Sequence, residues 1–231
     1  MPEWWSYGLS DFLLFSPRTY YRLLEHHNRA FWPAQLLAAG LGLGILGLLR
    51  RPTTGQGRII SAILALLWIW VSWAFIWKRY ATINWAASYV VPLFAIEALL
   101  LLWIGVARGR LIFRPRRNGA GILGIALFVL AVAFYPVLAP LAGRPWAQAE
   151  IFGLAPDPTV IATVGLLLLL EGSIRWALLA VPILWCLFSG ATLLAMGSRE
   201  ALILFATAFL SILATAWPQL SRGKQSGAVD G

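Results

Sequence analysis

The stretch AASYVVPLFAIEALLLLWIGVA, residues 86–107, is almost entirely apolar and has one charged side chain, that of Glu97, near its middle. A helix rises about 1.5 Å per residue, so this stretch is long enough to cross a hydrocarbon core of roughly 30 Å. The stretch predicts a transmembrane helix that carries a carboxyl group near mid-bilayer.

The whole chain has the composition of a membrane protein. Hydrophobic residues make up 60% of the 231 residues and charged residues 12%, which is unusual for a water-soluble domain. The net charge of +9 comes from short Lys and Arg clusters between apolar runs, a pattern typical of topology signals and not of a nucleic-acid surface. With Cys186 as the one cysteine, we expect no disulfide, no metal site and no cofactor.

Seven stretches have the pattern of spans, one of them short. We predict an all-α integral membrane helix bundle over residues 31–217, with helices at about 31–49, 59–77, 86–107, 121–141, 158–170, 176–196 and 201–217. The short helix has a strong start signal, an N-capping Asp157 followed by Pro158 at the first helical position. It reaches only about 20 Å, so it either crosses a thinned region or re-enters.

The distribution of basic residues favours seven crossings over six. With seven, eleven of the eighteen Lys and Arg residues share one side, and with six they divide nine and nine. The positive-inside rule then places the N-terminus outside and the tail, residues 218–231, in the cytoplasm. The polar, Gly-rich composition of that tail predicts disorder.

Residues 1–30 predict an amphipathic helix that lies in the membrane interface. Ser16 and Pro17 form a start signal, and a charged stripe follows on one face: Arg18, Arg22, Glu25 and Arg29. Aromatic anchors precede it at Trp4, Trp5 and Tyr7. The helix either caps the bundle or binds a partner.

Glu97 is the first candidate for a functional residue within the spans. An ionised carboxylate at mid-bilayer is costly, so intramembrane acids are functional candidates by default. Judged by depth along their spans, Thr163, Cys186 and Ser189 are the polar residues expected near it. Glu97 either moves protons or binds a ligand, or it is a neutral acid that joins helices through a hydroxyl group.

A second polar group is expected at the outer face, drawn from four stretches of chain. Its members are His26, His27, Asn28, Gln35, Asn84, Arg144, Glu150 and Asp157. These residues either line a pocket in which the N-terminus of the short helix receives an anion, or they cap and solvate helix ends as in any such protein.

Small residues in the first span predict a close helix contact. Gly40 and Gly44 form a G-x-x-x-G pair, which favours packing within the chain over the alternative, packing between two copies in a homo-oligomer. The thirteen tryptophans mostly lie near span ends or at lipid-facing positions, as in interfacial belts.

The sequence contains no common catalytic motif and no internal repeat, so it gives no positive argument for an enzyme. We expect a small-solute permease or channel-like protein of unknown substrate. The alternative is a non-catalytic membrane scaffold or accessory subunit, whose basic loop from Arg108 to Arg117 meets anionic lipid or a partner.

Four segments carry a resemblance to a known family: SDFLLFSPRTYYRL (10–23), NRAFWPAQ (28–35), YATINWAASY (80–89) and EIFGLAPDPTVIATVG (150–165). In this order they resemble an uncharacterised family of bacterial multi-spanning membrane proteins, defined as a domain of unknown function. The resemblance extends to about Met196. It implies a bacterial inner-membrane protein of six or seven spans. Some members carry labels such as permease or major-facilitator transporter, and no catalytic residue is implied.

Overall fold

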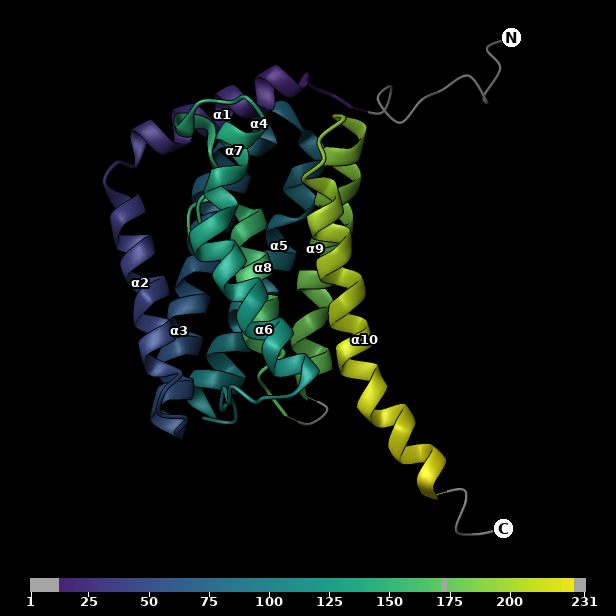
Figure 1. The fold of residues 1–231 in the computed structure, drawn as a ribbon. Coiled ribbons are helices and arrows are strands. Elements are labelled where there is room, and N and C mark those ends of the chain that lie inside the picture. The colour runs from purple at the N-terminus through teal and green to yellow at the C-terminus, as the bar shows by residue number, and fades with distance from the viewer. Residues whose placement is uncertain (1–12, 172–173, 227–231) are drawn as a thin grey trace.

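The computed structural model describes residues 13–171 and 174–226, and within these ranges the chain forms helices and no strands (Figure 1). The predicted anchors Trp4, Trp5 and Tyr7 lie outside the described residues, as does the end of the tail after residue 226. The all-α prediction is confirmed.

The described ranges contain ten α-helices: α1 (Pro17–Ala30), α2 (Ala34–Leu48), α3 (Thr54–Trp70), α4 (Ala81–Ile83), α5 (Val91–Leu100), α6 (Gly119–Val129), α7 (Leu138–Leu141), α8 (Pro156–Leu167), α9 (Ile174–Ala195) and α10 (Ala201–Ser226). Three π-helical stretches continue α-helices: η3 (Val71–Tyr80), η5 (Leu101–Ala107) and η6 (Leu130–Phe134). Three further segments are short 3₁₀ helices: η4 (Trp85–Tyr89), η7 (Tyr135–Val137) and η8 (Trp146–Gln148). α10 therefore continues past the end predicted at Trp217.

In the part of the chain that the structure describes, four helical segments are long and apolar enough to cross a membrane: Thr54–Ile83, Trp85–Ala107, Gly119–Leu141 and Ile174–Ala195. A fifth is reached if α1 and α2, which meet at an angle of 87°, count as one broken span. The predicted count of seven is not reproduced by length and composition, because α8 has twelve residues and the stretch Ala201–Ala216 of α10 counts among the shorter apolar helices.

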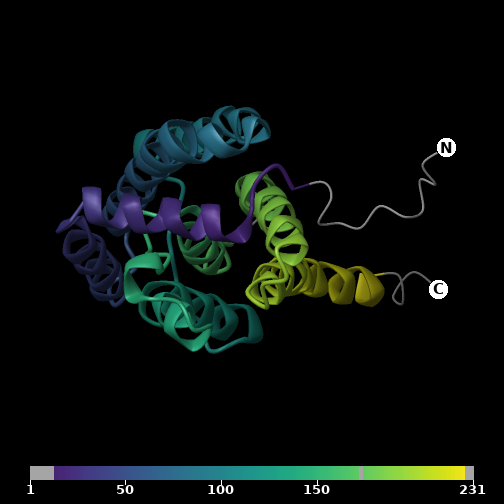
Figure 2. The same cartoon turned by 90° about the horizontal axis from the view of Figure 1, so that it is seen from above.

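α1 lies across one end of the bundle, as the view from above shows (Figure 2). It begins where predicted, with the Ser16 hydroxyl accepting from the backbone N–H of Thr19 at 3.2 Å. Tyr20 and Leu24 are buried, while the charged side chains of Arg18 and Arg22 are exposed. The amphipathic pattern of the sequence therefore sets the orientation of this helix on the bundle.

α8 occupies the centre of the bundle, and each of its residues is buried. Its closest neighbour is α6: a Cβ built on Gly124 or on Gly165 would come within 2.5 Å of the other glycine's carbonyl oxygen. The start of α8 corrects one prediction, because Ala155 is the N-cap residue and makes no side-chain capping bond. Asp157 lies inside the first turn, where its side chain is free to contact other helices.

The G-x-x-x-G pair of α2 is not an internal helix contact, which corrects the preferred interpretation. Gly40 and Gly44 are exposed, and a Cβ on either would meet no atom within 4 Å among the described residues. The side of α2 that faces the bundle contains Gly42, close to Val132 and Phe152. Spacing alone cannot say which face of a helix is inward.

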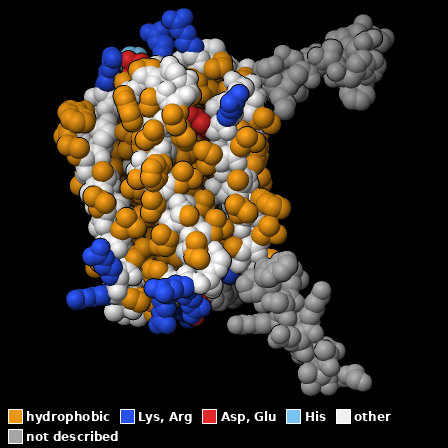
Figure 3. Space-filling model, in the orientation of Figure 1, with side chains coloured by type: hydrophobic (Ala, Val, Ile, Leu, Met, Phe, Trp, Pro, Cys, Tyr) orange, Lys and Arg blue, Asp and Glu red, His pale blue; other side chains and the backbone are white. Residues whose placement is uncertain are grey.

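Lys and Arg side chains gather at both ends of the bundle, with an apolar band between them (Figure 3). At the end opposite α1, the loop between η5 and α6 is held in place by the buried side chains of Leu111 and Phe113. Gln56 donates to the carbonyl of Phe113 at 3.2 Å, and the N–H of Arg114 donates to Leu169 at 3.2 Å. Five exposed arginines project from this fixed loop: Arg108, Arg110, Arg114, Arg116 and Arg117.

Candidate functional site

Asp157 is the most completely enclosed member of a buried acid cluster at the α1 end of the bundle. Its Oδ1 accepts from the indole Nε1 of Trp185 at 2.8 Å and from the hydroxyl of Ser189 at 2.7 Å. Both donors come from α9, one turn apart, so α9 presents two polar groups to the first turn of α8. These bonds stabilise the carboxyl group inside the bundle.

Glu150 joins this cluster from the connecting segment that precedes α8. The hydroxyl of Tyr20 on α1 donates to its Oε1 at 3.2 Å. Burial first, and then the charges of Asp157 and Glu200, raise the pKa of Glu150 well above its ordinary value, while Arg144 and Tyr20 act in the opposite direction. Glu150 therefore binds a proton far more readily than an exposed glutamate.

Two amides on and near α1 hold the connecting segment in position. Asn28 donates to the carbonyls of Ala147 and Ala149 at 2.9 and 2.8 Å. Gln35 in turn donates to the carbonyl of Asn28 at 2.7 Å. Glu150 follows directly after Ala149, so these bonds fix the depth at which its side chain enters the bundle.

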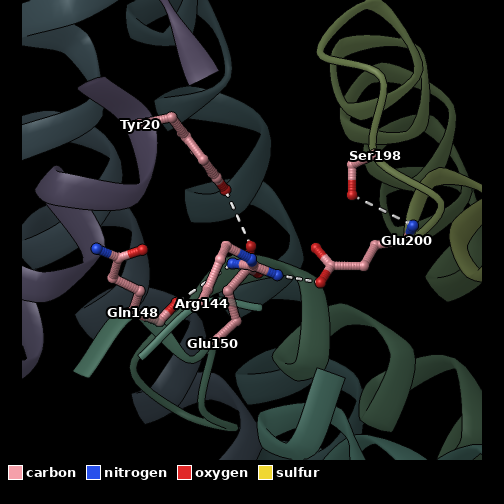
Figure 4. A network of polar contacts seen from close by, with 6 residues as sticks. All are labelled: Tyr20, Arg144, Gln148, Glu150, Ser198 and Glu200. Atoms are coloured by element: carbon pink, nitrogen blue, oxygen red, sulfur yellow. Dashed lines mark hydrogen bonds and ion pairs between the residues drawn. The ribbon is translucent and has the colours of Figure 1, made fainter. Parts of the chain in front are cut away.

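Arg144 and Glu200 form an ion pair that belongs to the same cluster (Figure 4). Arg144 also lies over the ring of Tyr21, with its guanidinium carbon 4.0 Å from the ring centroid. The pair lines a cavity of about 680 Å³ between α1, the end of α7 and the turn from α9 to α10. The cavity therefore gives access to the ion pair.

The cluster holds more acid than base. Glu150, Asp157 and Glu200 are 3%, 0% and 6% exposed, and the ion pairs among the described residues supply them with one guanidinium, that of Arg144. One carboxyl oxygen of each acid has no hydrogen-bond partner in the described part of the chain, and the same holds for the hydroxyl of Tyr135. The cluster therefore has unused capacity to bind protons or to accept hydrogen bonds.

Glu97 stands apart from this cluster. It is fully buried on α5, and neither carboxyl oxygen has a hydrogen-bond partner among the described residues. The expected hydroxyl partners serve elsewhere: Thr163 accepts from Trp68 at 2.9 Å and donates to the carbonyl of Thr159, and Ser189 donates to Asp157. An isolated buried carboxyl is stable only in its protonated form.

The remaining predicted residues divide between other environments. Cys186 is fully buried. His27 packs between the rings of Phe31 and Phe75, at 4.8 and 5.2 Å between centroids. Asn84 caps η4 by accepting from the N–H of Ala86 at 3.1 Å, and His26 is exposed.

Of the eight residues expected together at this end, Arg144, Glu150 and Asp157 share one cluster. Among the described residues, no group of three or more His, Cys, Asp or Glu side chains could hold a metal ion.

The sequence interpretation missed several members of the cluster: Tyr20, Tyr135, Trp185 and Glu200. A signal for Glu200 existed, because the turn between the last two predicted spans falls on the same side as Arg144 in the seven-span topology. Trp185 had no such signal. It and Trp68 are buried and donate to α8, which corrects the view of the tryptophans as belts for these two positions.

The fold and the cluster define a class: an all-helical bundle with four or five apolar helices that could span a membrane, built around a short central helix with a buried acid site. The chain belongs to the family of unknown function DUF6064, whose model matches residues 18–225. No curated protein and no solved structure matches it.

Proposed function

We propose that this chain is a bacterial inner-membrane protein with seven crossings, its N-terminus outside and its C-terminus in the cytoplasm. The short helix α8, fifth in chain order, supports the count of seven instead of six. It starts beside the buried acid cluster at the α1 end, and the chain leads from it to Leu169, which accepts from the N–H of Arg114 at the opposite end. Eleven of the eighteen basic residues then lie on the cytoplasmic side.

We propose further that the protein is a permease or channel-like protein for a small cation, proton included. The observation that carries this proposal is the excess of buried carboxyl groups in the cluster, of which that of Glu200 lines the cavity. Three buried carboxylates with one guanidinium would be strongly destabilising if all were ionised. Protons or a bound cation therefore balance the charge, and exchange between the two is the basis of many coupled transport steps.

The surroundings of α8 favour a cation over the anion expected from its free N-terminus. A helix N-terminus attracts negative charge, but Asp157 already lies in the first turn of α8 and Glu150 stands just before it. The helix dipole therefore acts on the protein's own carboxyl groups. Because Arg144 pairs with Glu200 at the cavity, an entering cation would compete with this guanidinium for the carboxylates.

A flux assay tests the transport function. The full chain is reconstituted into liposomes that contain a pH-sensitive dye, and the uptake of ²²Na⁺, ⁸⁶Rb⁺ and [¹⁴C]methylammonium is measured together with proton movement. We expect transport of protons or of at least one cation above that of empty liposomes. Asp157→Asn should reduce it by about tenfold or more, because removal of an interaction with a charged group is costly in a buried site.

Glu97→Gln is the matched control, since it makes the same kind of change in a buried acid outside the cluster. Glu200→Gln is a second cluster variant that can still accept a hydrogen bond from Arg144. Both proteins must elute as a single species in size-exclusion chromatography. Absence of all four fluxes in wild-type protein, or unchanged flux in both cluster variants, would contradict the proposal.

A scaffold or accessory subunit is the second candidate function, and the basic loop at the opposite end favours it. Hydrogen bonds from Gln56 to Phe113 and from Arg114 to Leu169 hold the backbone of this loop, so it presents five exposed arginines at one place, where a partner could recognise them. Replacement of Arg110, Arg114 and Arg117 by Gln should abolish co-purification of a partner if this function holds, and should leave the fluxes unchanged.

A further inference from the structure

A groove on the α1 end of the bundle collects basic side chains from two helices. It has a volume of about 410 Å³ and lies between one face of α1 and the last turns of the Thr54–Ile83 segment. α1 contributes Arg22 and His26, one turn apart, and the other helix contributes Lys78 and Arg79. None of the described residues that line the groove is acidic.

These charges are available to a ligand. The three ion pairs among the described residues involve Arg29, Arg116 and Arg144, so none of the four basic side chains of the groove is paired there. Arg79 is oriented by the ring of Phe31, with its guanidinium carbon 5.6 Å from the ring centroid. The one acid of α1, Glu25, bonds to Arg29 and to Gln148, and it does not line the groove.

The hydroxyl groups of the groove are already hydrogen-bonded, so the charged groups are the ones left to bind a ligand. Thr82 donates its hydroxyl proton to the carbonyl of Arg79 at 2.6 Å, and the Thr19 hydroxyl lies 2.9 Å from that of Ser16. Both are therefore engaged within their own helices. The free donors are guanidinium, ammonium and imidazole groups, which suit the oxygens of a phosphate. Leu23 and Ile83 add apolar surface to the lining.

We infer that this groove binds the phosphate of an anionic phospholipid headgroup. The inference rests on the proposed membrane insertion, because α1 then lies at the level of the headgroups with its groove beside the lipid. Topology signals do not explain the cluster, since in the proposed orientation most of the basic residues lie on the other side and only a minority lie here. A bound headgroup would hold α1 against the end of the Thr54–Ile83 segment.

Native mass spectrometry of the delipidated full chain in detergent tests the site. Phosphatidylglycerol is the probe and phosphatidylcholine, a zwitterionic lipid with the same phosphate, is the comparison. We expect tighter binding of phosphatidylglycerol by about fivefold or more, and a loss of about fivefold for each basic side chain removed in Arg22→Gln/Lys78→Gln. The control Arg18→Gln/Arg29→Gln removes the same charge from the same end and should change binding by less than about twofold.

The charge-preserving pair Arg22→Lys/Lys78→Arg should retain most of the binding, and it keeps the test valid if the neutral variant does not fold. Equal binding of the two lipids, or equal losses in the groove and control variants, would overturn the inference. Displacement of the lipid by inorganic phosphate, beyond that by chloride at the same ionic strength, would overturn the lipid source and assign the groove to free phosphate. Lipid binding without any cation flux would contradict the transport function alone.

Discussion

The two buried acid sites of this bundle differ in what surrounds them. Glu97 on α5 is buried with both carboxyl oxygens unpartnered in the described residues, whereas Asp157 on α8 accepts from Trp185 and Ser189 and adjoins two further acids and an arginine. Depth in the apolar stretch, which is the criterion available from sequence, favours Glu97 as the functional residue. Neighbouring donors and charges favour the Asp157 cluster as the functional site, because they set the protonation state of its acids.

Removal of the arginine should give the largest effect. Arg144→Met leaves Glu150, Asp157 and Glu200 without their guanidinium, and a buried ion pair that loses one partner typically costs about 3–5 kcal/mol. We expect a matching fall in stability, measured by thermal unfolding in detergent. The control is Arg199→Met, an exposed arginine of the same cavity. If Arg144→Met/Glu200→Met does not recover part of the loss, the ion pair is not its cause.

Loss of one donor to Asp157 should have the next largest effect. Trp185→Phe and Ser189→Ala each remove a hydrogen bond to the buried carboxyl group, which typically costs about 1–3 kcal/mol. Thermal unfolding of both variants measures the cost. Thr192→Ala, on the same helix, removes a hydroxyl that bonds to its own helix at the carbonyl of Phe188 and should cost less. Equal losses in all three variants would remove the special role of the Asp157 bonds.

The raised pKa of Glu150 should make the stability of the protein depend on pH. Because the pKa of Glu150 is higher in the folded state than its ordinary value of 4.5, its contribution favours folding below pH 4.5 and is lost as the pH rises through the higher folded-state pKa. Wild-type protein should therefore lose stability, relative to Glu150→Gln, as the pH is raised from 4.5. Thermal unfolding of the two proteins across this range gives the difference directly, and a difference that does not change with pH would contradict the raised pKa.

Replacement of Glu97 should give the smallest effect. Glu97→Gln and Glu97→Met leave no partner unsatisfied among the described residues, so we expect changes within about 1 kcal/mol. Met could even stabilise the bundle, since it removes a polar group from an apolar site. If Glu97→Met lowers the stability measured by thermal unfolding by more than about 2 kcal/mol while Glu97→Gln lowers it little, then Glu97 has a hydrogen-bond partner. That result would weaken the contrast between the two sites.

Local signals predicted much of the fold, and partner choice between helices was where they failed. The Ser16 cap and the limits of the Trp85–Ala107 and Gly119–Leu141 helices came from residues within each segment. The close contact expected at Gly40 and Gly44 occurs instead between Gly124 and Gly165, because any small residue permits an approach and only the packed bundle decides which one is used.

The candidate site shows the same division. Arg144, Glu150 and Asp157 were assigned to one end by counting predicted spans, but nothing local linked Ser189 or Trp185 to Asp157, since their side chains meet across helices. His27 and Asn84, expected with them, have other contacts: His27 packs against Phe31 and Phe75, and Asn84 caps η4.

The sequence by itself determined that the chain forms apolar helices, where most of them begin and end, and which polar residues face the cost of burial, because these properties depend on residues near in the chain. The tertiary structure alone decided that Glu97 is isolated and that Glu150, Asp157 and Glu200 meet around Arg144. The physical reason is that the state of a buried carboxyl group depends on the donors and charges around it, and in this bundle those come from four separate parts of the chain.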